Sequence, residues 1–253
     1  MPTPGFDLFD CDAALGRRHG ATALEPHSKA DLLASMDRCG IRRALVAHHS
    51  AWFSEVNLGN RLLTEETAAS DRLVGCWTAV PDDAGDTERI PRVLQNMLAA
   101  GGRAVRLMPK TMLWNLAEWC SGKLCTSLQE RQIPALIPLE ETSFDALHGV
   151  LTHHPQLRVM LLQLSYRIDR ELYPFALAHP NLYLSMSPRY SSHDGIERLR
   201  DQIGPERLLF GTRWPESEPG AGVSFTLYAR IPDSDKRLIA GANLDRLLAE
   251  VLA

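Results

Sequence analysis

RLLFGTRWPE, residues Arg207–Glu216, is the stretch that decides the fold of this chain. Its apolar run Leu208–Phe210 is short and unbroken, which is typical of a strand buried on both faces. Gly211 opens the backbone after this run, and a Trp-Pro pair then turns the chain. Arg213 therefore lies just beyond the carboxyl end of a strand, where open and closed parallel sheets carry their ligand-binding side chains.

Seven similar apolar runs precede this one, and amphipathic stretches separate them. The expected strands are Phe6–Cys11, Ala44–His48, Leu73–Ala79, Ala104–Met108, Ala135–Leu139, Val159–Gln163, Leu182–Ser187 and Leu208–Gly211. The expected helices include Lys29–Cys39, Ile90–Ala100, Phe144–Leu151, Asp194–Ile203 and a last helix that starts at Asp233 and is interrupted at Gly241. This alternation predicts an α/β fold, a (β/α)8 barrel formed by residues 1–253 as a single domain. An open doubly wound sheet is the alternative, but no glycine-rich nucleotide-binding motif follows a strand.

The amino-acid composition limits the classes of molecule that we expect the protein to bind. The chain has 253 residues, 45% of them hydrophobic, and a net charge of -4 from 27 Lys and Arg against 31 Asp and Glu. No run of like charges suggests a nucleic-acid or membrane partner, and no apolar stretch approaches the ~18 residues of a membrane span. The five cysteines are scattered and odd in number, and no signal peptide is recognisable. We therefore expect reduced thiols in a cytoplasmic protein.

Three segments resemble the amidohydrolase superfamily, in its branch of small amidohydrolase-related TIM barrels. Phe210–Pro215 is similar to the last-strand motif Phe-Gly-Ser/Thr-Asp-Trp/Tyr-Pro, and Leu238–Leu248 to the helix that closes these chains. Phe9–Gly16 resembles the first-strand motif Asp-x-His-x-His-x-Gly. Leu162–Arg167 resembles Leu-x-His-x-Gly, and a Pro-Asn-Leu-Tyr run follows it. The resemblance implies a (β/α)8 barrel whose relatives hydrolyse substrates with a bound metal.

The positions that bind metal in that family are substituted here. The two first-strand histidines correspond to Asp12 and Ala14, the sixth-strand histidine to Gln163 and the last-strand aspartate to Arg213. Catalytic metal sites usually take three protein ligands, and only one of these four side chains is a plausible ligand. The cationic Arg213 would repel a divalent ion. We therefore expect no metal cofactor.

These substitutions suggest a different role for the barrel mouth, the end of the barrel where the carboxyl ends of the strands lie. The first and eighth strands of a barrel are neighbours, so we expect Arg213 to take the place of the metal and pair with Asp12. This pair has two interpretations. In the first, it only stabilises an empty barrel top. In the second, the Arg213 guanidinium also binds a small anionic ligand such as a carboxylate or phosphate.

Side chains at the carboxyl ends of the strands are the candidates for this ligand site. They are Asp12, His48, Arg106, Glu140, Gln163, Arg167, Tyr190, Arg213, Trp214 and Glu216. Each candidate also has a simpler structural role as the alternative. Arg106 and Glu140 would pair with each other, and Trp214 would pack in the core. One of His48 and His49 would point outward. We expect Cys11 to face away from Asp12, because strand side chains alternate. A general acid–base pair without metal, such as Glu140 with His48, is a further interpretation.

Three functions remain open. The first is a barrel that has lost hydrolase activity and binds a small anionic molecule. The second is an enzyme that acts on a small carboxylated substrate, as a hydrolase or lyase, through Arg213 and Asp12. The third is a hydrolase that holds metal through unusual ligands such as Asp10, Asp12, His48 or Glu140. An expected helix at Trp114–Leu128 is the candidate surface for a homodimer, and its packing onto the barrel is the alternative.

Overall fold

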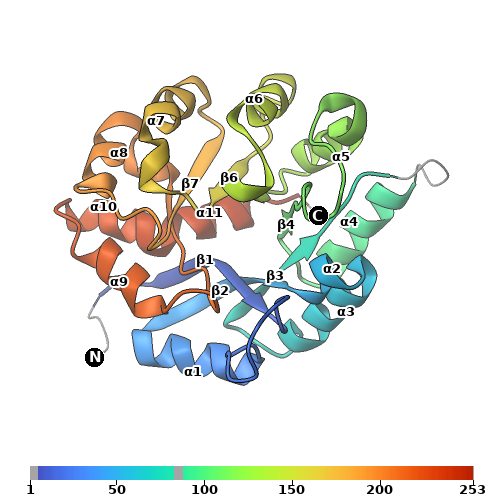
Figure 1. Ribbon diagram of the computed structural model, residues 1–253, viewed down its shortest axis with the longest axis horizontal. Coiled ribbons are helices and arrows are strands. Elements are labelled where there is room, and N and C mark those ends of the chain that lie inside the picture. The colour runs from blue at the N-terminus through green and yellow to red at the C-terminus, as the bar shows by residue number, and fades with distance from the viewer. Residues whose placement is uncertain (1–4, 83–87, 253) are drawn as a thin grey trace.

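The computed structural model describes residues 5–82 and 88–252, which form a barrel of parallel strands enclosed by helices (Figure 1). Each strand pairs with the next one along the chain. The strands are β1 Leu8–Leu15, β2 Ile41–His48, β3 Leu73–Thr78, β4 Ala104–Arg106, β5 Ala135–Pro138, β6 Val159–Leu162, β7 Leu182–Met186 and β8 Leu208–Phe210. A hydrogen bond of 2.9 Å from Ala14 N to the carbonyl of Trp214 joins β1 to the segment after β8. The predicted (β/α)8 barrel is confirmed.

Helices follow the strands and cover the outside of the barrel (Figure 1). They are α1 Lys29–Cys39, α2 Ser50–Phe53, α3 Val56–Thr67, α4 Arg89–Ala99, α5 Glu118–Glu130, α6 Phe144–His153, α7 Asp169–Ala178, α8 Gly195–Ile203, α9 Pro219–Leu227, α10 Asp233–Arg237 and α11 Asn243–Ala249. No helix in the described part of the chain is long and apolar enough to cross a membrane. The helix expected at Trp114–Leu128 begins only at Glu118, because the four residues before it belong to the loop after β4.

The last helix is interrupted where the sequence predicts. A π-helical turn, Leu238–Ala242, separates α10 from α11. Gly241 lies in this turn, and a Cβ atom there would come within 2.3 Å of the carbonyl oxygen of Asp7. The glycine therefore lets the helix pack directly against the start of β1.

The barrel interior is apolar at its lower levels and polar near the carboxyl ends of the strands. Cys11 Sγ lies 3.3 Å from Ser185 Oγ on β7, and Asp12 forms an ion pair with Arg106 on β4. Since neither β7 nor β4 pairs with β1, both contacts cross the interior. The pairing register of β1 with β2 shifts between Asp10 and Ala13. This irregularity turns two consecutive side chains inward, and the expectation that Cys11 faces away from Asp12 was wrong.

Candidate ligand-binding site

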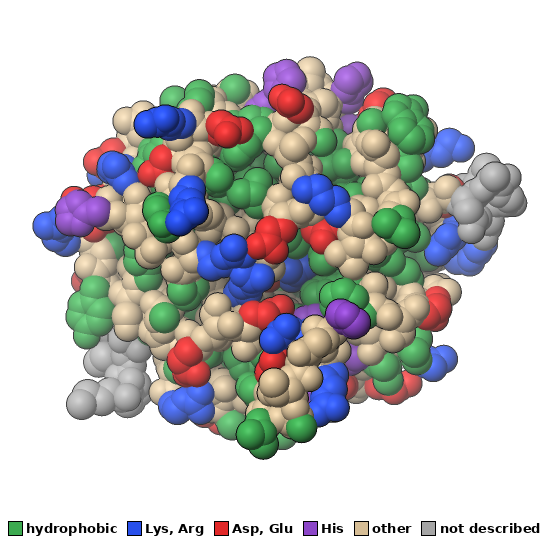
Figure 2. Space-filling model, in the orientation of Figure 1, with side chains coloured by type: hydrophobic (Ala, Val, Ile, Leu, Met, Phe, Trp, Pro, Cys, Tyr) green, Lys and Arg blue, Asp and Glu red, His purple; other side chains and the backbone are tan. Residues whose placement is uncertain are grey.

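A cavity of about 230 Å³ opens at the carboxyl ends of the strands. Five of the residues expected from the sequence line it: Arg106, Glu140, Gln163, Arg213 and Glu216. The other lining residues are Arg18, His19, His49, Trp52, Phe53, Met108, Thr111, Pro138 and Glu141. On the face shown in Figure 2, acidic and basic side chains lie close together near the centre. The cavity therefore combines charged groups of both signs with an aromatic wall.

A buried ion pair forms the floor of this cavity. Arg106 Nη1 lies 2.8 Å from Asp12 Oδ1, and the two side chains are only 4% and 2% exposed. The guanidinium carbon of Arg106 lies 4.7 Å from the centre of the Trp52 ring, and Trp52 Nε1 donates a 2.8 Å hydrogen bond to Thr78 Oγ1. The expected pair between Asp12 and Arg213 is wrong, since Arg106 reaches the carboxylate instead.

Several polar atoms around the cavity are buried without a hydrogen-bond partner in the described residues. They are Asp12 Oδ2, Arg106 Nε and Arg213 Nε. Leaving a buried donor or acceptor unpaired costs about 1–3 kcal/mol. Arg106 and Arg213, which line the cavity, and Asp12 beneath it therefore each carry an unsatisfied buried polar atom.

Arg213 lies beside Glu140 rather than beside Asp12. Its Nη2 is 4.0 Å from Glu140 Oε2, while the other carboxylate oxygen of Glu140 accepts a direct hydrogen bond from Arg189. The hydrogen bond with Arg189 and the charge of Arg213 hold the pKa of Glu140 below its usual value. The expected pair of Arg106 with Glu140 does not form.

The backbone is strained at two cavity-lining positions that follow strands. Gln163, after β6, has φ of 59°, and Arg213, after β8, has φ of 60°. Residues other than glycine rarely adopt this left-handed conformation, which costs of order 1–3 kcal/mol and is concentrated at functional sites. Two of the four substituted metal-binding positions therefore retain a constrained backbone.

His49 and His48 point in opposite directions, as expected for neighbours at a strand end. His49 faces the cavity: its Nδ1 lies 3.0 Å from the carbonyl oxygen of Gly16, and its Nε2 lies 3.6 Å from Glu216 Oε1. Burial raises the pKa of Glu216, but the contacts with His49 and Arg213 outweigh it and leave the pKa below its usual value.

His48 lies outside the cavity, with its Nε2 3.8 Å from Glu66 Oε1 on α3. Burial, aided by the charge of His49, lowers the pKa of His48 to about 4. An acid–base pair of Glu140 with His48 is therefore wrong, because the two side chains lie on different sides of the barrel wall.

Three more expected residues also lie away from the cavity. Arg167 is exposed and stacks on Tyr166. Tyr190 is buried and its hydroxyl donates to Asp169 Oδ1 at 2.8 Å, which ties the loop after β7 to α7. Trp214 is 2% exposed and packs in the core. Tyr190 and Trp214 therefore support the fold, and Arg167 faces solvent.

Asp10, one of the unusual metal ligands considered from the sequence, is a buried carboxyl. Its Oδ1 accepts hydrogen bonds of 2.9 Å from the backbone N–H groups of Asp12 and Thr212, and its Oδ2 lies 2.5 Å from Thr212 Oγ1. Burial raises its pKa to about 6 in spite of these bonds. Asp10 therefore holds the segment after β8 against β1. It fixes the position of Thr212, the residue directly before Arg213.

Comparison with known proteins agrees with this architecture. The sequence matches the amidohydrolase family over residues 10–249. The chain belongs to the amidohydrolase family. No curated protein was found to match it in sequence.

Solved structures share the fold of this chain at low sequence identity. One is an uncharacterized TIM-barrel protein from Bordetella bronchiseptica, with 18% identity, a TM-score of 0.74, and coverage of 97% of this chain and 99% of that one. A second is a 5-carboxyvanillate decarboxylase from Sphingomonas paucimobilis, with 16% identity, a TM-score of 0.76 and the same coverage. A third is a 5-carboxyvanillate decarboxylase from Novosphingobium aromaticivorans in complex with manganese and 4-hydroxy-3-methoxy-5-nitrobenzoic acid. It has 15% identity, a TM-score of 0.77, and coverage of 97% of this chain and 96% of that one.

The donor set of this chain does not fit the metal that its family implies. Within residues 5–82 and 88–252, no three His, Cys, Asp or Glu side chains are placed to hold a metal ion. Asp12 is neutralised by Arg106, Ala14 has no donor atom, and Gln163 offers only an amide. Arg213 adds a second guanidinium to the same cavity. Divalent metals require deprotonated or neutral donors without competing cations, so these side chains do not form such a site.

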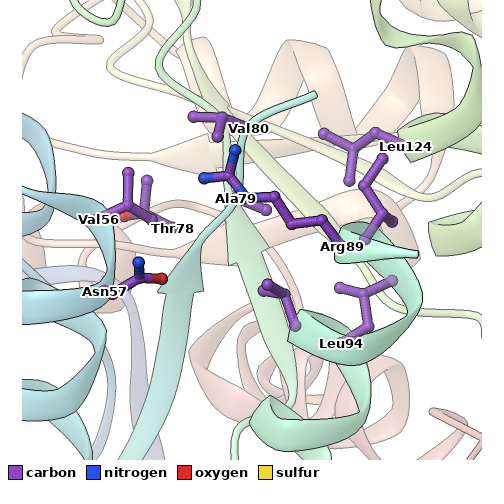
Figure 3. A pocket seen from close by; sticks show the side chains of 10 residues that line it. Val56, Asn57, Thr78, Ala79, Val80, Arg89, Leu94 and Leu124 are labelled. Atoms are coloured by element: carbon purple, nitrogen blue, oxygen red, sulfur yellow. The ribbon is translucent and has the colours of Figure 1, made fainter. Parts of the chain in front are cut away.

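A second hollow lies between α3, the end of β3 and α4 (Figure 3). It is lined by Val56, Asn57, Thr78, Ala79, Val80, Arg89, Ile90, Val93, Leu94 and Leu124. Its volume of about 10 Å³ is close to the minimum for one water molecule, so it is a packing defect rather than a ligand site.

The aromatic wall was missing from the sequence-based prediction. Trp52 and Phe53 belong to α2, which has only four residues and therefore shows no helical period. His49 packs edge-on against Trp52, with ring centres 4.8 Å apart. The signal that could have found this wall is its position directly after β2, together with the alternation that separates His48 from His49.

Proposed function

We propose that this protein binds a small anionic molecule, a carboxylate or phosphate, in the barrel-mouth cavity without a catalytic metal. The observation that carries this proposal is the presence of Arg106 and Arg213 in one cavity, each with a buried Nε that has no partner among the described residues. Guanidinium groups bind carboxylates and phosphates through charge-assisted, often paired hydrogen bonds.

The size of the cavity and its lining residues limit which ligands can bind. An apolar cavity of about 150 Å³ admits benzene, so a cavity of about 230 Å³ suits one ring with a few substituents. Trp52, Phe53 and Met108 supply apolar contact area on one side. The two related decarboxylases are named for a small carboxylated aromatic compound, which supports testing this class first.

Binding measurements on single variants test the proposal. Titration calorimetry with benzoate and with inorganic phosphate should show binding to the wild type, and Arg213→Gln should weaken it by about tenfold or more, the usual effect of losing a charge-assisted hydrogen bond. Arg167→Gln is the matched control, because this exposed arginine does not line the cavity. Equal affinity in the wild type and Arg213→Gln would contradict the proposal.

A second function, a metal-free hydrolase or lyase acting on a small carboxylated substrate, is favoured by one further feature. His49 lines the cavity, with its Nε2 3.6 Å from Glu216 Oε1 and its Nδ1 3.0 Å from the carbonyl oxygen of Gly16. A histidine next to a carboxylate in a cavity is a candidate for proton transfer to or from a substrate. Turnover of carboxylated aromatic compounds by metal-depleted protein, lost in His49→Gln, is the result expected of an enzyme. Binding without turnover favours the first proposal.

A further inference from the structure

Glu140 bridges two arginines from different loops at the mouth of the cavity. It lies in the short 3-10 turn Leu139–Glu141, directly after β5. One carboxylate oxygen accepts a hydrogen bond from Arg189 in the loop after β7, and the other faces Arg213 after β8. The side chain lines the cavity and is nevertheless 57% exposed.

The two contacts of this carboxylate are unequal. Arg189 makes a direct hydrogen bond, whereas the nearest atoms of Glu140 and Arg213 are 4.0 Å apart, beyond hydrogen-bonding distance. The Arg213 side chain is only 19% exposed, and its Nε has no partner among the described residues. Arg213 therefore lies next to a negative charge without a hydrogen bond to it.

We propose that Glu140 is a specificity-determining internal anion, which competes with the carboxylate or phosphate group of the ligand for Arg213. The proposal rests on the anion-binding function given above. An entering anion takes the donors of Arg213, and Glu140 keeps its hydrogen bond with Arg189. Exposed ion pairs contribute only about 0–1 kcal/mol, so giving up the looser contact costs little. A neutral ligand forms no strong bond with Arg213 and leaves Glu140 in place.

The consequence is that Glu140 weakens anion binding and lowers the preference of the cavity for an anion over a neutral ligand. Two like charges within about 4–6 Å disfavour each other by an amount equivalent to one or more pKa units. Removing the charge of Glu140 should therefore raise the affinity for an anion by about tenfold. Glutamine keeps the size of the side chain, and the main-chain carbonyl of residue 140, which accepts a hydrogen bond from Lys110, is unaffected.

Benzoate titrations of full-length wild type, Glu140→Gln, Glu141→Gln and Glu218→Gln test this inference. Glu140→Gln should bind benzoate about tenfold more tightly than the wild type. Glu141 lines the same cavity but bonds to Thr111, so Glu141→Gln should give a smaller gain. Glu218 forms an exposed pair with Arg38 outside the cavity, and Glu218→Gln is the control for losing a surface ion pair.

Benzamide, which has the same ring without the negative charge, should bind equally weakly to the wild type and Glu140→Gln. Affinity for benzoate that is equal or lower in Glu140→Gln overturns the inference, and so does an equal gain in Glu141→Gln. The proposed function is tested separately by Arg213→Gln. Benzoate binding that depends on Arg213 but not on Glu140 overturns only the inference. Absence of benzoate binding in every variant overturns both.

Discussion

Asp12 and Arg106, 94 residues apart in the sequence, form a buried ion pair across the interior of the barrel. A carboxylate within β1 thus has an internal arginine at the end of β4 as its partner. The pair spans strands that are not neighbours, so it fixes β1 and β4 relative to each other.

Breaking this pair should destabilise the barrel strongly. Arg106→Met leaves Asp12 as a buried carboxylate without a counter-charge, which typically costs about 3–5 kcal/mol. Urea denaturation should show this loss. The double variant Asp12→Asn with Arg106→Met removes both charges and should recover a large part of the loss. If Arg106→Met alone is as stable as the wild type, the ion pair does not support the fold.

Metal should neither copurify with nor stabilise the wild-type protein. Elemental analysis after dialysis should find zinc and manganese well below one ion per chain, and added Mn²⁺ or Zn²⁺ should not raise the melting temperature. The physical reason is that Arg106 and Arg213 bring two positive charges to the cavity. Stoichiometric metal that survives dialysis would favour a hydrolase with unusual ligands instead.

A variant with restored ligands provides the comparison for this experiment. Ala14→His, Gln163→His and Arg213→Asp together supply two imidazoles and a second carboxylate at the positions that the family resemblance identifies. This triple variant should be stabilised by Zn²⁺ when the wild type is not, because zinc prefers such ligands.

The barrel could be predicted from local signals. Ser28 caps α1 and forms a capping box with Asp31, and Gly40 ends the helix with φ of 70°. Both features act within a few residues, so the predicted range Lys29–Cys39 coincides with α1. The helices α2, α3, α7 and α9 were not identified: α2 is very short, and α7 contains Pro174.

The partners within the site could not be predicted in the same way. Neighbouring strands suggested that Asp12 would meet Arg213, but the shift in register at Asp10–Ala13 turns Asp12 toward β4. The length of the Arg106 side chain then allows it to reach across the barrel. Strand order limits which residues share the barrel mouth, whereas side-chain reach and local irregularities decide which of them touch.

Asp10 and His48 should give opposing contributions to the dependence of stability on pH. The pKa of His48 is lowered to about 4 in the folded protein, below 6.5 for an unperturbed histidine. The stability that neutral His48 contributes to the folded state is therefore lost as the pH falls from 6.5 to 4. The pKa of Asp10 is raised from 3.8 to about 6, so its contribution is present at low pH and lost as the pH rises to 6. Each shift of about two units corresponds to roughly 3 kcal/mol.

Single variants should separate these two contributions. Relative to the wild type, Asp10→Asn should gain stability more steeply as the pH rises from 4 to 6.5, since only the effect of His48 remains. His48→Gln should instead lose stability relative to the wild type over the same range. Urea denaturation at several pH values measures both slopes, and slopes that match the wild type in both variants would contradict these assignments.

Gly211, which follows β8, should tolerate no side chain. The sequence suggested that this glycine opens the backbone, but its φ is not positive. A Cβ atom there would lie 2.3 Å from Ser185 Oγ and 3.2 Å from Cys11 Sγ inside the barrel. Overpacking of this kind costs about 1–3 kcal/mol, so Gly211→Ala should lower stability to urea by that amount.

Two further variants distinguish lack of space from loss of backbone freedom at this position. Ser185→Ala removes the closest atom, so the double variant Gly211→Ala with Ser185→Ala should regain much of the lost stability. Gly149→Ala is the control in α6, where no atom lies within 4 Å of the added Cβ, and it should gain about 0.5–1 kcal/mol. If Ser185→Ala restores nothing, the cost of Gly211→Ala arises in the backbone rather than in the packed interior beneath Arg213.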